Sequence, residues 1–134
     1  MRTFHGEEVL SQDLEFLRDG EIIQVVLDPF QVRFVFDNGT EVRSAFRFEI
    51  KKADSDEALY FQFGIQPRPA FDFYQLLRRK VIEIDAEAED HLVLTLENDD
   101  TLMFLVEGRV GETLEISRFS GEKGRWSIDW QRFF

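Results

Sequence analysis

Cysteine is absent from this 134-residue sequence, and histidine occurs only twice. Without cysteine the chain can form neither a disulfide framework nor a thiolate metal site, and this absence fits a reducing compartment. Neither histidine, His5 or His91, stands beside a nucleophile motif such as Gly-x-Ser-x-Gly, so the sequence contains no recognisable hydrolytic triad. We therefore expect a protein that is not an enzyme and that needs neither a metal nor another cofactor.

Long apolar runs are also missing. The longest, residues 102–106, is far shorter than the about 20 residues that a membrane-spanning helix requires. Residues 1–8 contain a single arginine and no apolar stretch, so the sequence predicts no signal peptide. From these two absences we expect a cytoplasmic protein.

Basic residues are scarce relative to acidic ones. The 16 lysines and arginines stand against 27 aspartates and glutamates, which gives a formal net charge of −11. Such a field repels nucleic acids and anionic membranes but attracts basic proteins. The sequence therefore favours a basic protein partner, and argues against a nucleic acid or a membrane. A second interpretation stays open, in which the charge serves only to keep the domain soluble.

Apolar residues, by contrast, are plentiful enough for one hydrophobic core. They make up 43% of the chain, and 15 of them are phenylalanine. A chain of this length usually forms one domain, so we predict a single domain over residues 1–134.

Two halves of the chain, residues 11–64 and 70–131, share one pattern. At a spacing of 59 residues the sequence pairs Leu14 with Phe73, Leu17 with Leu76, Ile22 with Val81, and Val25 with Ile84. We interpret this pattern as a diverged internal repeat. Each half is predicted to be a short helix followed by a three-strand meander, because apolar residues alternate along the later segments.

Several local signals refine this prediction. Ser11 suits a helix N-cap, and Gly20 suits a left-handed residue after the helix. Asn38-Gly39 predicts a type I′ hairpin turn. One strand is expected from Thr40 to Ile50, and hairpins are expected around the polar segment 54–57 and over residues 113–131. The fold class is mainly β (α+β), with about nine strands in a curled sheet, a sandwich or a partly open barrel.

These motifs resemble a family of small acidic bacterial β-domains of unknown function. The resemblance rests on Ile22-x-x-Val25 with the turn at 37–40, on Val81-x-x-Ile84 with the turn at 98–101, and on the segment 115–130. It covers about residues 10–130, and Asp99-Asp100 stand where the pattern has a glycine. It implies an accessory role of the toxin-immunity kind, and it provides no catalytic residues.

The leading hypothesis is therefore a protein-binding domain, most concretely an immunity-type antidote that neutralises a basic toxin or effector. The acidic clusters do not match a calcium-binding EF-hand loop, so we expect them to be partner contacts rather than metal ligands. The candidate contacts are acidic loop residues and two tyrosines, namely Asp54, Asp56, Glu57, Glu87, Glu89, Asp90, Asp99, Asp100, Tyr60 and Tyr74.

Two alternatives remain. Phenylalanines at alternating strand positions could line a cavity for a small apolar ligand, as in a carrier; they are Phe34, Phe36, Phe46, Phe48, Phe61 and Phe63. Alternatively, Phe133, Phe134 and exposed strand edges could join two copies in a self-assembling homodimer.

Overall fold

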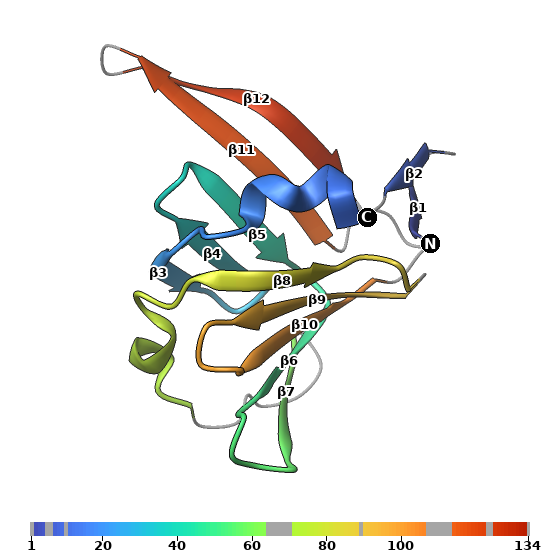
Figure 1. The fold of residues 1–134 in the computed structure, drawn as a ribbon, viewed down its shortest axis with the longest axis vertical. Coiled ribbons are helices and arrows are strands. Elements are labelled where there is room, and N and C mark those ends of the chain that lie inside the picture. The colour runs from blue at the N-terminus through green and yellow to red at the C-terminus, as the bar shows by residue number, and fades with distance from the viewer. Residues whose placement is uncertain are drawn as a thin grey trace.

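The computed structural model describes residues 2–4, 7–9, 11–63, 71–88, 90–106, 114–122 and 125–133 (Figure 1). Over these residues the chain is mainly β, as the sequence predicts. Two short 3-10 helices, η1 (Ser11–Leu17) and η2 (Phe73–Leu76), accompany the strands. Strands β1 (Arg2–Phe4) and β2 (Glu7–Val9) pair only with each other.

Ten strands form two antiparallel sheets. Sheet I has the order β12-β11-β5-β4-β3, from β3 (Ile22–Leu27), β4 (Val32–Phe36), β5 (Thr40–Ser44), β11 (Leu114–Glu122) and β12 (Arg125–Phe133). Sheet II has the order β7-β6-β10-β9-β8, from β6 (Arg47–Lys51), β7 (Ala58–Gln62), β8 (Val81–Asp85), β9 (His91–Leu96) and β10 (Thr101–Leu105). The hairpin of β11 and β12 extends beyond the rest of sheet I (Figure 1).

The two halves of the chain exchange strands between the sheets. The meander β3-β4-β5 lies in sheet I, but the next hairpin, β6-β7, lies in sheet II beside β10. In the same way the meander β8-β9-β10 lies in sheet II, whereas β11 and β12 return to sheet I beside β5. Neither sheet is therefore built from one half alone.

This exchange corrects one prediction, because the single strand expected from Thr40 to Ile50 is two strands. The chain bends at Ala45 and Phe46, and it passes there from sheet I to sheet II. Val42 before the bend and Phe48 after it are both fully buried in the same core cluster. The apolar alternation therefore continues through the bend, and it cannot reveal that the strand has changed sheet.

The core lies between the two sheets. Phe34 of sheet I contacts Phe48 and Phe104 of sheet II edge to face, with ring centroids 5.7 Å and 5.6 Å apart. Phe48 in turn stacks on Phe61 at 4.6 Å. Such contacts add to the free energy gained by burying the rings. They favour a packed core, rather than a ligand cavity, at these phenylalanines.

The starts of β3 and β8 are joined by backbone hydrogen bonds. The Ile22 N–H donates to the Arg79 carbonyl and the Val81 N–H donates to the Gly20 carbonyl, both at 3.0 Å. A bridge between residues 21 and 80 lies at the same place. This junction ties the two sheets together at one end of these two edge strands.

Left-handed residues lie close to this junction, but not where the sequence predicts them. Asp19 (φ 65°) and Arg78 (φ 69°) adopt this conformation, whereas Gly20 does not. Gly20 is instead tightly enclosed, since a Cβ there would lie 3.0 Å from the Leu17 carbonyl oxygen. The turn after β4 is not type I′ either, because Gly39 (φ 84°) has a positive φ and Asn38 does not. A type I turn followed by a left-handed residue explains this geometry.

Helix η1 covers the edge of β8. The Ala86 N–H donates to the Ser11 hydroxyl at 2.9 Å, and that hydroxyl donates to a Glu87 carboxylate oxygen, also at 2.9 Å. Arg18 donates from its guanidinium to the Ile82 carbonyl. Ser11, predicted to cap the helix, therefore links η1 to the end of β8.

Candidate functional site

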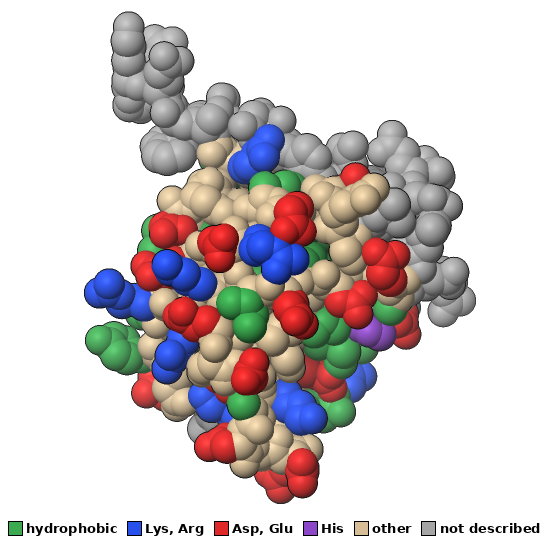
Figure 2. Space-filling model, in the orientation of Figure 1, with side chains coloured by type: hydrophobic (Ala, Val, Ile, Leu, Met, Phe, Trp, Pro, Cys, Tyr) green, Lys and Arg blue, Asp and Glu red, His purple; other side chains and the backbone are tan. Residues whose placement is uncertain are grey.

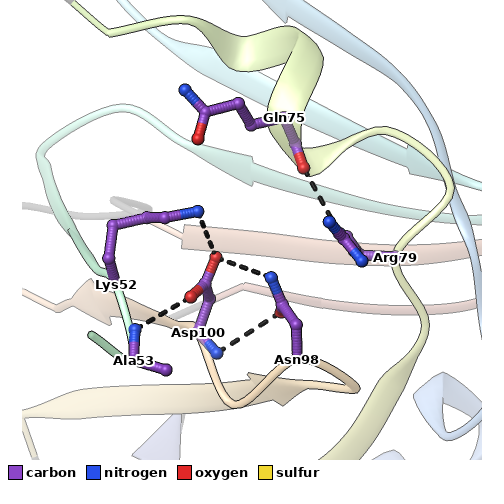
Figure 3. A network of polar contacts seen from close by, with 6 residues as sticks. All are labelled: Lys52, Ala53, Gln75, Arg79, Asn98 and Asp100. Atoms are coloured by element: carbon purple, nitrogen blue, oxygen red, sulfur yellow. Dashed lines mark hydrogen bonds and ion pairs between the residues drawn. The ribbon is translucent and has the colours of Figure 1, made fainter.

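Two turns lie side by side at one end of sheet II. The first, residues 53–57, joins β6 to β7, and the second, residues 97–100, joins β9 to β10. The Asp100 carboxylate connects them, because it accepts hydrogen bonds from Lys52 Nζ at 2.7 Å and from the Ala53 N–H at 2.9 Å (Figure 3). It accepts a further bond from Asn98 Nδ2 at 2.9 Å. Three donors from both turns therefore converge on one carboxylate.

Asp100 is only 2% exposed, so it is part of the fold and not a surface contact. Burial raises the pKa of its carboxyl, but the hydrogen bonds from Lys52, Ala53 and Asn98 outweigh burial, and the pKa lies below its usual value. The carboxylate therefore stays ionised between the turns and keeps them in fixed relative positions.

The exposed carboxylates of these turns form what we call the acidic tip, namely Asp54, Asp56, Glu57 and Asp99. Asp56 and Asp99 line the same depression of about 230 Å³, although they belong to different turns. Lys51 and Lys52 also line it. Since Lys52 pairs with Asp100, the exposed charge of the tip is predominantly negative.

The remaining acidic candidates lie at the other end of β9, in the turn after β8. The Glu87 carboxylate accepts hydrogen bonds from Ser11, and Asp90 lies 2.7 Å from His91 Nδ1. Glu89 lies outside the described residues. The structure therefore divides the predicted acidic contacts between two ends of sheet II and does not gather them into one patch.

The two candidate tyrosines are exposed but lie on different elements. Tyr60 is on β7, three residues after the acidic tip ends, and it is 46% exposed. The Arg47 guanidinium lies 4.6 Å from its ring centre. A hydrogen bond with Glu49 raises the pKa of the Tyr60 hydroxyl, so the phenol stays neutral at physiological pH. Tyr74, 77% exposed, lies on η2 away from the tip's two turns.

Charges of both signs cover the face that η1 and β8 present. Figure 2 shows acidic and basic side chains interspersed there, so this face has no single-signed field. In the part of the chain that the structure describes, no group of three histidine, aspartate or glutamate side chains is placed to hold a metal ion. The chemistry that the acidic tip offers is thus the binding of cationic groups.

One group of exposed residues was missed from the sequence. Ile23, Leu27 and Phe30 lie on or next to the edge strand β3, and they are 51%, 37% and 73% exposed. A signal was present, because β3 reads Ile-Ile-Gln-Val-Val-Leu and carries no charge in a chain of 32% charged residues. The repeat pattern drew attention to its buried positions only.

Comparison of the chain with protein-family models, with curated proteins and with solved structures finds no match. Within the described ranges, no helix has the length and apolar character needed to cross a membrane. The functional argument therefore rests on the geometry above.

Proposed function

We propose that this chain is a non-enzymatic bacterial protein-binding domain that recognises a basic partner through the acidic tip. In its most concrete form it is a cytoplasmic immunity-type antidote, and the partner is a basic toxin or effector. The observation that carries the proposal is the Asp100 network, which fixes two turns so that four exposed carboxylates share one end of sheet II. Preorganised charges bind with a smaller loss of conformational entropy than mobile ones.

The tip and Tyr60 supply complementary contributions. Exposed carboxylates attract a basic surface from a distance and speed its association. Tyr60 lies on the same hairpin, and tyrosine is one of the side chains that most often anchor an interface. The proposed interface is therefore the β6–β7 hairpin together with the turn before β10.

The experiment compares two sets of neutralised carboxylates. The tip variant carries Asp54→Asn, Asp56→Asn, Glu57→Gln and Asp99→Asn. The matched control removes the same charge at the other end of sheet II, with Glu83→Gln, Asp85→Asn, Glu87→Gln and Asp90→Asn. Each protein is used to capture partners from a lysate of the source organism at low and at moderate salt, and the affinity of any captured basic protein is then measured.

The tip variant should lose about tenfold or more in affinity, together with most of the salt dependence, because each tenfold corresponds to about 1.4 kcal/mol of lost attraction. The control should bind nearly as the wild type does. Loss of binding only in the control would place the interface at the β8–β9 end. A captured partner that neither variant weakens would overturn the proposal.

We also infer that the two halves derive from one duplicated unit and form a two-layer β-sandwich, as in the acidic bacterial domains that the sequence resembles. Support comes from the junction, where Ile22 and Val81 make corresponding hydrogen bonds and are 59 residues apart. The bulges near the starts of β3 and β8 also correspond. A chain in which residues 20–44 are replaced by the corresponding second-half segment should still fold cooperatively, as judged by urea denaturation. Loss of folding would contradict the inference.

A further inference from the structure

The outer edge of β3 is open where the corresponding edge of β8 is covered. Ser11 and Arg18 of the η1 region bond to the end and middle of β8, through the Ala86 N–H and the Ile82 carbonyl. On β3 only the first residue, Ile22, is bonded in this way, by the segment that follows η2. No described residue outside β4 hydrogen-bonds to the backbone of Val25 or Leu27.

The direction of these backbone groups follows from the hydrogen bond that ends the strand. The Asp28 N–H points toward β4, since it donates to the Gln31 carbonyl at 3.1 Å. Backbone groups alternate in direction along a strand, so those of Val26 also face β4. Those of Val25 and Leu27 therefore point outward, and they form a template for another strand.

The usual protections of a free edge are missing from this strand. Natural edge strands commonly carry lysine, other charges or proline, which discourage pairing with a further strand. Residues 22–27 contain none of these. The bulge of β3 lies near its start, between Ile22 and Gln24, and leaves the segment from Val25 to Leu27 regular.

The chemistry of β3 fits a second copy of this chain better than a basic partner. A basic partner would gain nothing from an uncharged strand, because it offers no carboxylate to pair with. Two chains of net charge −11 repel each other, and they can approach most closely where neither carries charge. A two-fold axis would place this uncharged strand against itself.

An exposed side chain and a pocket lie at matching positions on this edge. Phe30, 73% exposed, is four residues after Val26, and its turn is fixed because Asp28 Oδ1 accepts from the Phe30 and Gln31 N–H groups. Ile22 is four residues before Val26. It borders a pocket of about 340 Å³ between β3 and η2, whose lining also includes Ile23, Tyr74, Leu77 and Arg78.

We propose that β3 pairs antiparallel with β3 of a second copy, about a two-fold axis at Val26, and that Phe30 of each copy enters the pocket beside Ile22 of the other. In this register Val25 of one copy exchanges backbone hydrogen bonds with Leu27 of the other. The two sheets I become one continuous sheet. Because the contact is the same surface on both chains, it closes as a dimer and does not extend into a fibre.

The absence of cysteine makes the register directly testable. In the proposed dimer the two Val26 residues face each other as a non-hydrogen-bonded pair, with a Cα separation of about 4.5 Å, which a disulfide can bridge. The variant Val26→Cys should therefore form a disulfide-linked dimer rapidly under mild oxidation. The matched control is Asp85→Cys, 59 residues later on the covered edge of β8, which should stay unlinked.

A second measurement follows the mass of the protein without cross-linking, by sedimentation or light scattering over a range of concentrations. The wild type should approach twice the chain mass of 15.9 kDa at high concentration. Val26→Lys should weaken the dimer by roughly tenfold or more, because it places like charges directly opposite each other. Phe30→Ala should weaken it as well, whereas Val93→Lys on β9 of sheet II should not.

Salt separates this proposal from the proposed function. Added salt should strengthen the dimer, since it screens the repulsion between two acidic chains, whereas it should weaken capture of a basic partner. A wild type that stays monomeric at its highest soluble concentration would overturn the dimer. So would a dimer that Val26→Lys leaves intact and in which Val26→Cys cross-links no faster than Asp85→Cys.

Discussion

Replacing Asp100 by asparagine tests the network that joins the two acidic turns. The carboxylate receives donors on both oxygens: Lys52 and Asn98 on Oδ2, and the Ala53 N–H on Oδ1. An asparagine side chain has one acceptor oxygen and one NH₂ group, so one of these faces must place a donor against a donor. The variant keeps the shape of the side chain but loses at least one bond to it.

The expected loss of stability follows from these contacts. A hydrogen bond to a charged group contributes about 1.5–3 kcal/mol, and leaving a buried donor unsatisfied costs about 1–3 kcal/mol. Lys52 is 29% exposed and can be partly rehydrated, which reduces the loss. We therefore expect Asp100→Asn to lower the free energy of unfolding by about 2–3 kcal/mol. Asp99→Asn removes the same charge from the exposed neighbour and should change it by less than about 0.5 kcal/mol.

Urea denaturation of both variants and the wild type, followed by circular dichroism, measures these differences. The pH dependence provides a second test. The pKa of Asp100 is lowered in the folded state, so its contribution is complete above the unfolded pKa of about 3.9 and is lost as the pH falls through the folded value. The gap between the wild type and Asp100→Asn should be constant near neutral pH and should shrink in acid. Equal stabilities of Asp100→Asn and Asp99→Asn at neutral pH would refute this account.

Three further substitutions test the fold. Gly39→Ala should destabilise the chain by roughly 2 kcal/mol or more in urea denaturation, because Gly39 has φ 84° and a Cβ would lie 2.3 Å from the Phe119 carbonyl oxygen; an unchanged midpoint would show that the turn adapts. Phe48→Ala should cost about 3–5 kcal/mol, measured in the same way, since Phe48 is fully buried between the sheets. A loss below about 1 kcal/mol would contradict the packing described. Arg78→Gly should raise the stability by roughly 0.5–1 kcal/mol, because it relieves a left-handed conformation (φ 69°), and a lower melting temperature would count against that reasoning.

The sequence predicted the fold class because alternation of apolar residues is a direct consequence of a half-buried strand. Positions such as Val32, Phe34 and Phe36 were correctly expected on one face, and all three are buried. It did not predict the bend at Ala45, since residues on both sides of the bend face one core and preserve the alternation. The exchange of hairpins between the sheets is a long-range property that local patterns do not encode.

The candidate site could be predicted only in part, for a similar reason. Asp54, Asp56 and Asp99 are exposed, as acidic turn residues usually are. Asp100 is indistinguishable from Asp99 by composition, but it is buried because Lys52 approaches from a hairpin 48 residues away. The open edge of β3 depends on which strand ends up last in its sheet, so it also required the strand order.

The strand exchange also bears on how the protein is made. Sheet I combines residues 22–44 with the strands that begin at Leu114, close to the end of the chain. Sheet II, although it closes earlier, shares its phenylalanine core with sheet I through Phe34. A nascent chain on the ribosome therefore holds Val42 and its neighbours without their final partner strand until the last segment has emerged. Folding of this domain should be completed only after its synthesis ends, and the half-made chain is the stage at which it most needs protection from aggregation.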